Sequence, residues 1–139
     1  MVMTNIVNTS GKRKTAIARA SISKGKGKIK INSVPVETYG TRLVRMKIKE
    51  VLVIASGYVN MDKIDIKVKV KGGGFMGQMD AIMSSIARGL VEWSKDEKLH
   101  NAYLEYDRTI IAGDHRQTEP HKPSQSRKGP RHKRQKSYR

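Results

Sequence analysis

The chain has 139 residues, with 29 Lys and Arg against 12 Asp and Glu and a formal charge of +17. It has no cysteine, which excludes disulfides and thiolate metal sites, and no apolar run near the about 20 residues of a transmembrane helix. So large a positive charge favours a polyanionic partner, with nucleic acid ahead of an anionic membrane surface.

The positive charge is concentrated at the two ends. Segment 1–36 has eight basic residues and no acid, 37–107 has eleven basic and ten acidic residues, and 108–139 has ten basic and two acidic residues. Such a layout is typical of a foldable domain that carries basic arms. We therefore expect a globular domain over residues 1–107 and an extended basic tail over 108–139. No secretion signal opens the chain, so a cytoplasmic location is expected.

Two short alternating segments come first. The stretch "TAIARASIS" (15–23) alternates small or apolar residues with polar ones, which predicts a half-buried strand. The stretch "KIKIN" (28–32) predicts a second strand. We expect Gly25 and Gly27 to form a hairpin turn between the two strands, and Pro35 to end their pairing.

A helix is predicted between Thr41, which can cap its start, and Gly57, which can close it. The cations Arg42, Arg45 and Lys49 share a face of this helix. That face fits a second nucleic-acid surface and a merely solvated surface equally well. The apolar stripe on another face consists of Val44, Ile48, Val51, Leu52 and Ala55.

The second half of the predicted domain contains a strand and two helices. The stretch "KIDIKVKVK" (63–71) alternates cleanly and predicts a half-buried strand, and "GQMDAIMSSIARGLVEW" (77–93) predicts a helix. A shorter helix is expected to start at Asp96 and to include Tyr103, and periodicity stops after Asp107. This order predicts an α+β fold, a small mixed sheet with helices packed on one face.

Three glycines between the last strand and the following helix match the pattern G-x-G-x-x-G of dinucleotide-binding folds, at Gly72, Gly74 and Gly77. Glu92 lies about twenty residues further on but within the predicted helix, whereas the acid of that pattern ends the next strand. A phosphate-binding Walker loop does not fit either, because Gln78 stands where that motif requires Lys. The glycines serve either a phosphate near a helix N-terminus or only a tight turn.

Other catalytic or metal-binding patterns are lacking. The four histidines show no ligand spacing, and no Ser, His and Asp set stands out. We expect no metal, no cofactor and no enzymatic activity. The histidines are His100, His115, His121 and His132.

Three stretches together resemble one family: "GKRKTAIARA" (11–20), "VKGGGFMGQMDAIMSSIARGL" (70–90) and "KRQKSYR" (133–139). The chain is similar to the ninth protein of the small ribosomal subunit, in its archaeal form, whose members end in "SYR". The resemblance implies a fold like the second domain of ribosomal protein S-five, with a left-handed β-α-β crossover. It also implies a place on ribosomal RNA (rRNA) in the subunit head, among neighbouring head proteins.

The family's tail implies a second contact, with the anticodon stem-loop of the tRNA in the peptidyl site. By position this role falls on Arg139, with Lys136 and Tyr138 nearby. Tyr138 replaces a basic residue of the bacterial ending, so this sequence departs from that pattern at one contact position.

The residues expected to bind rRNA are cations and loop residues. Lys12, Arg13 and Lys14 precede the first predicted strand and are expected on a loop. Lys24, Lys26 and Lys28 lie at the predicted hairpin tip. Phe75 and Met76 either face RNA or pack the glycine loop against the core. The full set is Lys12, Arg13, Lys14, Arg19, Lys24, Lys26, Lys28, Gly72, Gly73, Gly74, Gln78, Arg127, Lys128, Arg131, Lys133 and Arg134.

Three hypotheses follow from the sequence. The first is a structural ribosomal protein that binds rRNA and peptidyl-site tRNA by positioning and charge neutralisation, without homo-oligomers or membrane contact. The second is an architectural nucleic-acid binder of chromatin type. The third is a nucleotide-dependent oxidoreductase that uses the glycine loop.

Overall fold

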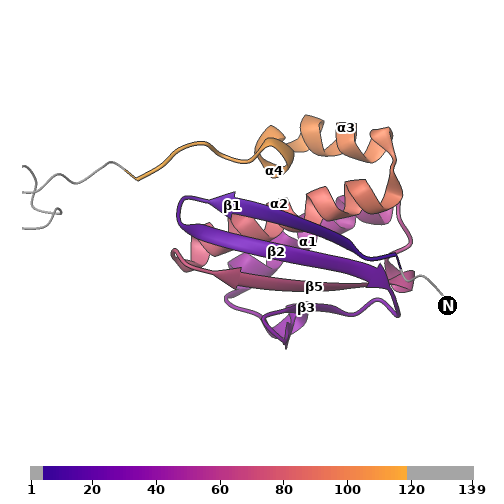
Figure 1. The fold of residues 1–139 in the computed structure, drawn as a ribbon, viewed down its shortest axis with the longest axis horizontal. Helices are drawn as coiled ribbons and strands as arrows, with labels where there is room; N and C mark the ends of the chain where they lie inside the picture. Colours follow the sequence, from indigo (N-terminus) through magenta and orange to yellow (C-terminus); the bar gives the residue numbers. More distant parts are fainter. Residues whose placement is uncertain (1–4, 119–139) are drawn as a thin grey trace, which may run out of the picture.

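The computed structural model describes residues 5–118, which form an α+β domain with one five-stranded mixed sheet (Figure 1). The fold class expected from the sequence is confirmed. In chain order the elements are β1 (Val7–Arg13), β2 (Ala16–Lys24), β3 (Ile29–Ile31), β4 (Val34–Pro35), the 3-10 turn η1 (Val36–Thr38), α1 (Arg42–Ser56), the 3-10 turn η2 (Met61–Lys63), β5 (Ile64–Lys71), α2 (Phe75–Ser94), α3 (Glu97–Tyr106) and α4 (Arg108–Ala112).

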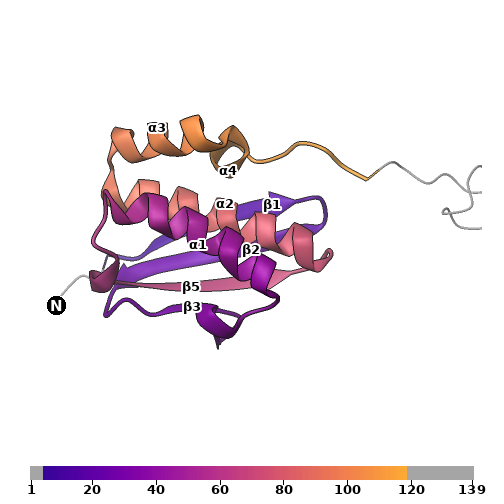
Figure 2. The ribbon, with the colours of Figure 1, turned by 180° about the vertical axis from the view of Figure 1, so that it is seen from behind.

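The strands lie in the order β1-β2-β5-β3-β4. β2 pairs antiparallel with both β1 and β5, whereas β3 pairs parallel with β5. From the helical side, the chain follows β3, returns through α1 in front of the sheet and then enters β5 (Figure 2). This crossover is left-handed, the exception to the usual hand, as the resemblance implies.

The helices cover only one face of the sheet. α2 packs directly on β1, β2 and β5, α1 lies beside α2 on the same face, and α3 and α4 lie beyond α2 (Figures 1 and 2). The cause is the period of two in the strands, which turns alternate side chains to the core. The inward residues of β2 and β5 are fully or almost fully buried and form most of the core's sheet side. They are Ala16, Ala18, Ala20, Ile22, Ile64, Ile66, Val68 and Val70.

Close packing of α2 against β1 depends on small residues. A Cβ placed on Gly11 of β1 would overlap the carbonyl oxygen of Ala81 in α2. The hydroxyl of Thr9, also in β1, donates a hydrogen bond of 2.8 Å to the carbonyl of Ser85. The first strand therefore lies against the helix with its backbone almost in contact, and large apolar side chains have no room there.

The three predicted helices are confirmed, with boundaries shifted by a few residues at most. Thr41 caps α1 by accepting a hydrogen bond from the backbone N–H of Val44, and Gly57 follows its last turn. Asp96 caps α3 in the same way through the N–H of Lys98. These side chains satisfy backbone donors that a helix start leaves without partners. No helix within residues 5–118 is long and apolar enough to cross a bilayer.

The predicted hairpin at Gly25 and Gly27 is wrong, because β5 lies between β2 and β3. The intervening loop instead folds around the start of β5. The backbone N–H groups of Lys26 and Lys28 donate to the carboxylate of Asp65 at 2.8 and 2.9 Å. Glycine-rich turn signals are local, so they cannot distinguish a tight hairpin from a wider turn that admits a third strand.

The strands β1 and β4 and the helix α4 were missed in the sequence. In β4, Pro35 pairs with Lys30 and does not end the pairing. Lys12 and Arg13 lie in β1, not on a loop, and Lys14 follows in the turn with a φ of 53°. β1 lacks apolar alternation because Thr9 and Gly11 occupy its inward positions. α4 is missed because five residues are too few to show a helical period.

α4 also extends the packed part of the chain beyond the point where periodicity was expected to stop. Asp107 caps this helix, accepting hydrogen bonds from the backbone N–H and the hydroxyl of Thr109 at 2.9 and 2.7 Å. Ile110 is buried in the core. The segment that follows Asp107 therefore begins as part of the domain's packing.

The hydroxyl of Tyr103 in α3 is fully buried and donates a 2.8 Å hydrogen bond to the carbonyl of Val51 in α1. We expect Tyr103→Phe to lower the free energy of unfolding by about 1 kcal/mol, because a buried hydrogen bond is lost. Urea unfolding followed by circular dichroism measures this. The matched control is Tyr106→Phe in the same helix, whose hydroxyl bonds Glu50 at the surface. Equal losses for the two variants would contradict the role of the buried bond.

Candidate nucleic-acid interface

The face of the sheet opposite the helices carries a row of cations. Paired residues point to the same side of a sheet, so the register places Arg19 beside Lys69 and Lys67 beside Lys30. Each of these side chains is exposed. We call this surface the cationic sheet face. It consists of Lys12, Arg19, Lys30, Lys67, Lys69 and Lys71.

Between these cations lies a shallow groove, lined by Asn8, Thr9, Ser10, Arg19, Ala20, Ser21, Lys67 and Lys69. Ser21 donates a 2.7 Å hydrogen bond to Asn8 across the strands. The lining offers ammonium, guanidinium, hydroxyl and amide groups but no aromatic ring on which a base could stack. Such a surface suits contacts with phosphate and sugar, which position a nucleic acid without reading its sequence.

Asp65 is the only acid in the five strands. The hydrogen bonds from the backbone N–H groups of Lys28 and Lys26 hold the pKa of this carboxyl below its ordinary value. The carboxylate of Asp65 therefore holds the loop before β3 in place through these hydrogen bonds. The cationic sheet face beyond it has no acidic residue to offset its charge.

The predicted cations are distributed over this face and both ends of the sheet. Lys12 and Arg19 belong to the cationic sheet face. Lys14 is exposed in the turn at one end, and the exposed residues Lys24, Lys26 and Lys28 lie at the other. Their contacts with RNA stay predictions.

Sequence reasoning did not select Lys30, Lys67, Lys69 and Lys71. The signal was available, because the outward positions of "KIDIKVKVK" after Asp65 are all lysine. What the sequence lacked was the neighbour of each strand. Only pairing with β2 and β3 turns a row of three lysines on β5 into a two-dimensional surface.

The glycine loop is a tight connection from β5 to α2. Gly72 and Gly73 have φ values of +78° and +64°, and a Cβ on Gly72 would lie 2.6 Å from the carbonyl oxygen of Thr15. Gln78 closes the loop by donating to the carbonyl of Gly72 at 3.1 Å. Positive φ and close backbone approach both require glycine, which supports the tight-turn interpretation.

This loop does not have the surroundings of a dinucleotide site. β5 pairs antiparallel with β2, and Glu92 lies within α2, so the strand that should present the acid is absent from residues 5–118. Phe75 and Met76 are 64% and 40% exposed, so neither side chain closes the loop against the core. Contacts of Gly72, Gly73, Gly74 and Gln78 with rRNA stay predictions.

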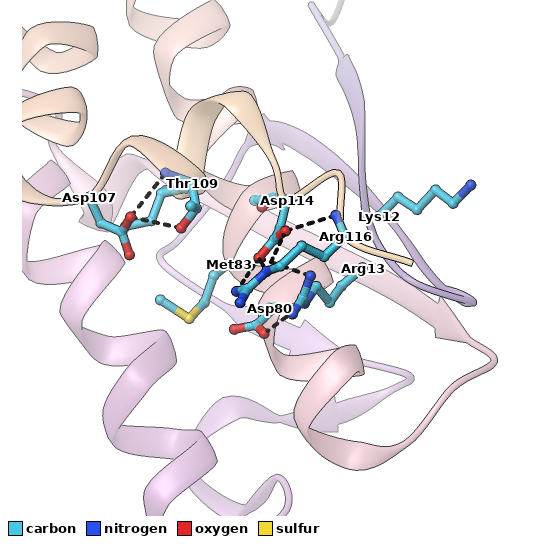
Figure 3. Close-up of a pocket in the computed structure, with 10 residues that line it drawn as sticks. Lys12, Arg13, Asp80, Met83, Asp107, Thr109, Asp114 and Arg116 are labelled. Atoms are coloured by element: carbon cyan, nitrogen blue, oxygen red, sulfur yellow. Dashed lines mark hydrogen bonds and ion pairs between the residues drawn. The ribbon is translucent and has the colours of Figure 1, made fainter. Parts of the chain in front are cut away.

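Arg13 holds the segment after α4 against the body (Figure 3). Its Nη1 lies 2.9 Å from a carboxylate oxygen of Asp114, and its Nε lies 3.6 Å from Asp80 in α2. Arg116 contacts the same carboxylate of Asp114 at 2.6 Å. The Arg13 side chain forms ion pairs within the protein and is only 15% exposed, and its contact with RNA stays a prediction.

The pKa values of Asp114 and Asp80 in this cluster are shifted in opposite directions. Hydrogen bonds from the side chain and backbone of Arg116 hold the pKa of Asp114 well below its ordinary value. Burial raises the pKa of Asp80, as do the carboxylates of Asp114 and Asp107, while the charge of Arg13 opposes that rise. Asp114 is therefore the carboxylate whose charge the cluster stabilises.

Within residues 5–118 no three His, Cys, Asp or Glu side chains are arranged to hold a metal.

The remaining predicted positions fall in two groups, one on α1 and one in the tail. Arg42, Arg45 and Lys49 lie on α1, on the helical side of the sheet. The tail positions lie outside the described residues: Arg127, Lys128, Arg131, Lys133, Arg134, Lys136, Tyr138 and Arg139, together with His121 and His132.

The low pKa of Asp114 makes a pH prediction. Because its folded-state pKa lies below the unfolded value of about 3.9, its ion pairs stabilise the fold at higher pH, and this contribution is lost as pH falls through the folded-state value. We expect Asp114→Asn to lower the urea midpoint at pH 6, and the gap from wild type to narrow below about pH 4. Glu105→Gln, an exposed acid of α3, should leave the midpoint unchanged. If the difference in urea midpoint between Asp114→Asn and wild type were the same at every pH, the ionic role of Asp114 would be contradicted.

Comparison with known proteins places the chain in a family. The family model described as ribosomal protein S9/S16 matches residues 11–139. Proteins called small ribosomal subunit protein uS9 from the archaea Methanococcus maripaludis (strain C7) and Methanococcus vannielii are 47% and 46% identical to it over 134 residues, which is 96% of this chain and 98% of each relative. The resemblance noted in the sequence is thereby confirmed, and the chain belongs to the ribosomal protein S9/S16 family.

Proposed function

We propose that this protein is a structural constituent of the small ribosomal subunit that binds rRNA in the subunit head, on ribosomes of the cytoplasm. Its family and the names of its relatives support this assignment. The observation that carries rRNA binding is the cationic sheet face, an exposed surface of six cations with no acid among them. The role is positioning and charge neutralisation, which needs no catalytic centre.

The layered fold supplies a physical mechanism for this binding. The core and the helices occupy one side of the sheet, so the other side is free to lie against a polyanion. Cations that neutralise phosphates release condensed counterions, and this release favours binding without base recognition. Neighbouring proteins of the subunit head are the further partners in this proposal.

The tail is the second part of the proposal. Beyond the ion pairs of Asp114, the described chain leads away from the body (Figure 1). We infer that the rest of the tail follows rRNA towards the peptidyl site, with Arg127, Lys128, Arg131, Lys133 and Arg134 as phosphate contacts. At its end, Lys136, Tyr138 and Arg139 contact the anticodon stem-loop of the bound tRNA. The support is the match of the family model through residue 139 and the run of cations in the sequence.

Sedimentation of a cell lysate tests the assignment to the ribosome. A tagged full-length chain should migrate with small subunits in a sucrose gradient, at moderately high salt and after DNase treatment. RNase treatment should release it. Sedimentation with DNA, abolished by DNase and not by RNase, would instead favour the architectural chromatin-type hypothesis and overturn the proposal.

Neutralising the lysines of β5 should weaken rRNA binding. For the variant Lys67→Gln, Lys69→Gln, Lys71→Gln, we expect the slope of log K against log salt concentration to fall in magnitude by about 2 to 3, because three phosphate contacts are lost. Filter binding of the full chain to small-subunit rRNA at several salt concentrations measures this slope.

The matched control removes three cations from the helical side, by Arg42→Gln, Arg45→Gln and Lys49→Gln on α1. Both variants have the same net charge. Equal slopes for the two would show that total charge, and not the cationic sheet face, determines binding.

Deleting residues 134–139 should leave assembly of the small subunit intact and weaken retention of tRNA in the peptidyl site. The deletion removes three cations, so the α1 variant serves again as a control of equal charge. Retention of labelled tRNA on reconstituted subunits is the measurement. Undiminished retention would contradict the tRNA contact, and loss of assembly would assign the tail to building the head.

A further inference from the structure

The start of the tail is held to the body by a second arginine, Arg88 of α2. Its Nε donates a 2.7 Å hydrogen bond to the carbonyl of Ile111 in α4, and its Nη1 donates at 3.0 Å to the carbonyl of Ser10 in β1. One side chain thus joins a strand, a long helix and the short helix before the tail. Together with the Arg13–Asp114 ion pair, it fixes residues 111–116 against the body.

A recess lies at this junction, and most of its charged lining is cationic. It is lined by Lys12, Arg88, Arg108, Thr109, Ala112, Gly113, Asp114, His115 and Arg116. The four Lys and Arg residues come from β1, α2, α4 and the segment after α4, so only folding brings them together. The one acid is Asp114, whose carboxylate contacts both Arg13 and Arg116. Converging cations repel one another, and an anion in the recess relieves that repulsion.

The lining identifies the kind of anion. It offers guanidinium and ammonium groups around the single imidazole ring of His115 and has no large apolar side chain, so an acyl chain has nothing to pack against. Guanidinium groups bind phosphate oxygens through paired, charge-assisted hydrogen bonds. A phosphodiester group fits this lining, because its oxygens can bind the guanidinium groups and it needs no apolar surface to pack against.

The recess is also continuous with the cationic sheet face. Lys12 belongs to both surfaces, and its side chain extends away from Asp114 (Figure 3). Gly113 lets the chain pass close to Arg88, because a Cβ there would lie 3.2 Å from Nη2 of Arg88, and its φ of +78° disfavours any side chain.

We propose that the recess between β1, α2 and α4 binds a backbone phosphate of rRNA and thereby fixes the start of the tail to RNA and to the body at once. The proposal rests on the proposed rRNA binding and adds a site to it. A phosphate held by Arg108 and Arg116 contacts the body and the start of the tail together. The direction in which the tail leaves the domain is then set at the point where the tail first contacts RNA.

The first experiment follows backbone amide signals of the full chain by NMR while inorganic phosphate is added at constant ionic strength, against a chloride control. We expect saturable shifts at Gly113 and Arg116 in the wild type. The shifts should weaken in Arg108→Gln and persist in Lys98→Gln, which removes an exposed cation of α3 outside the recess. Shifts that grow linearly without saturation, or that are equal in the two variants, would overturn the site.

The second experiment measures the salt dependence of binding to small-subunit rRNA. Arg108→Gln should lower the magnitude of the slope by about 0.7 to 0.9, the value for one phosphate contact. Lys98→Gln should leave the slope unchanged, and Arg108→Lys should retain most of it. The spectrum of each variant shows whether it is folded.

The outcomes separate this site from the broader proposal. If Arg108→Gln behaves like Lys98→Gln while the β5 lysine variant still loses affinity, the recess is wrong and the sheet-face interface stands. If the wild type shows no salt-dependent binding to rRNA, the proposed function itself fails.

Discussion

The alternation of β5 is the constraint on which the rest of the structure depends. A strand turns successive side chains to opposite faces, so Ile64, Ile66, Val68 and Val70 enter the core while Lys67, Lys69 and Lys71 point away from it. A central strand of this kind can fold only if one face of its sheet is covered and the other meets water or a polyanion. The left-handed return through α1 places that helix on the same face as α2, so the lysine face stays uncovered. In the proposed function, stability and RNA binding thus use opposite faces of the same strand.

The acids that pair within the body serve its architecture. Asp65 accepts hydrogen bonds from the backbone of the loop before β3, Asp107 caps α4, and Asp114 contacts two arginines where the tail begins. Each carboxylate determines where a cationic segment lies. A protein with a charge of +17 needs such fixed points, because mutual repulsion would otherwise separate its basic segments from the body.

The sequence predicts the elements that have a clear period and a cap. α1, α2, α3 and β5 are found because their apolar residues recur at regular intervals and Thr41 and Asp96 are good caps. β1 and α4 are missed for physical reasons: β1 replaces apolar side chains with Thr9 and Gly11 to admit α2, and α4 is shorter than two turns. The insertion of β5 between β2 and β3 is a long-range fact that no local turn signal contains. Because strand neighbours cannot be deduced from local signals, single cations such as Lys12 and Arg19 were predicted as contacts, whereas the cationic sheet face was not.

The distribution of aromatic residues bears on the kind of RNA contact this domain can make. Proteins that read single-stranded RNA on a sheet stack bases on exposed aromatic side chains. Here the five strands contain no aromatic residue, and the exposed apolar side chain between Lys12 and Lys71 is Ile17. A branched aliphatic group can pack against ribose but gives a base no π-face to stack on. The sheet is therefore suited to the backbone of RNA that is already folded, and its selectivity would come from the shape of that backbone. A rigid sheet with a fixed tail origin fits such a target, because phosphates held by RNA tertiary structure are matched only by cations whose spacing is also fixed.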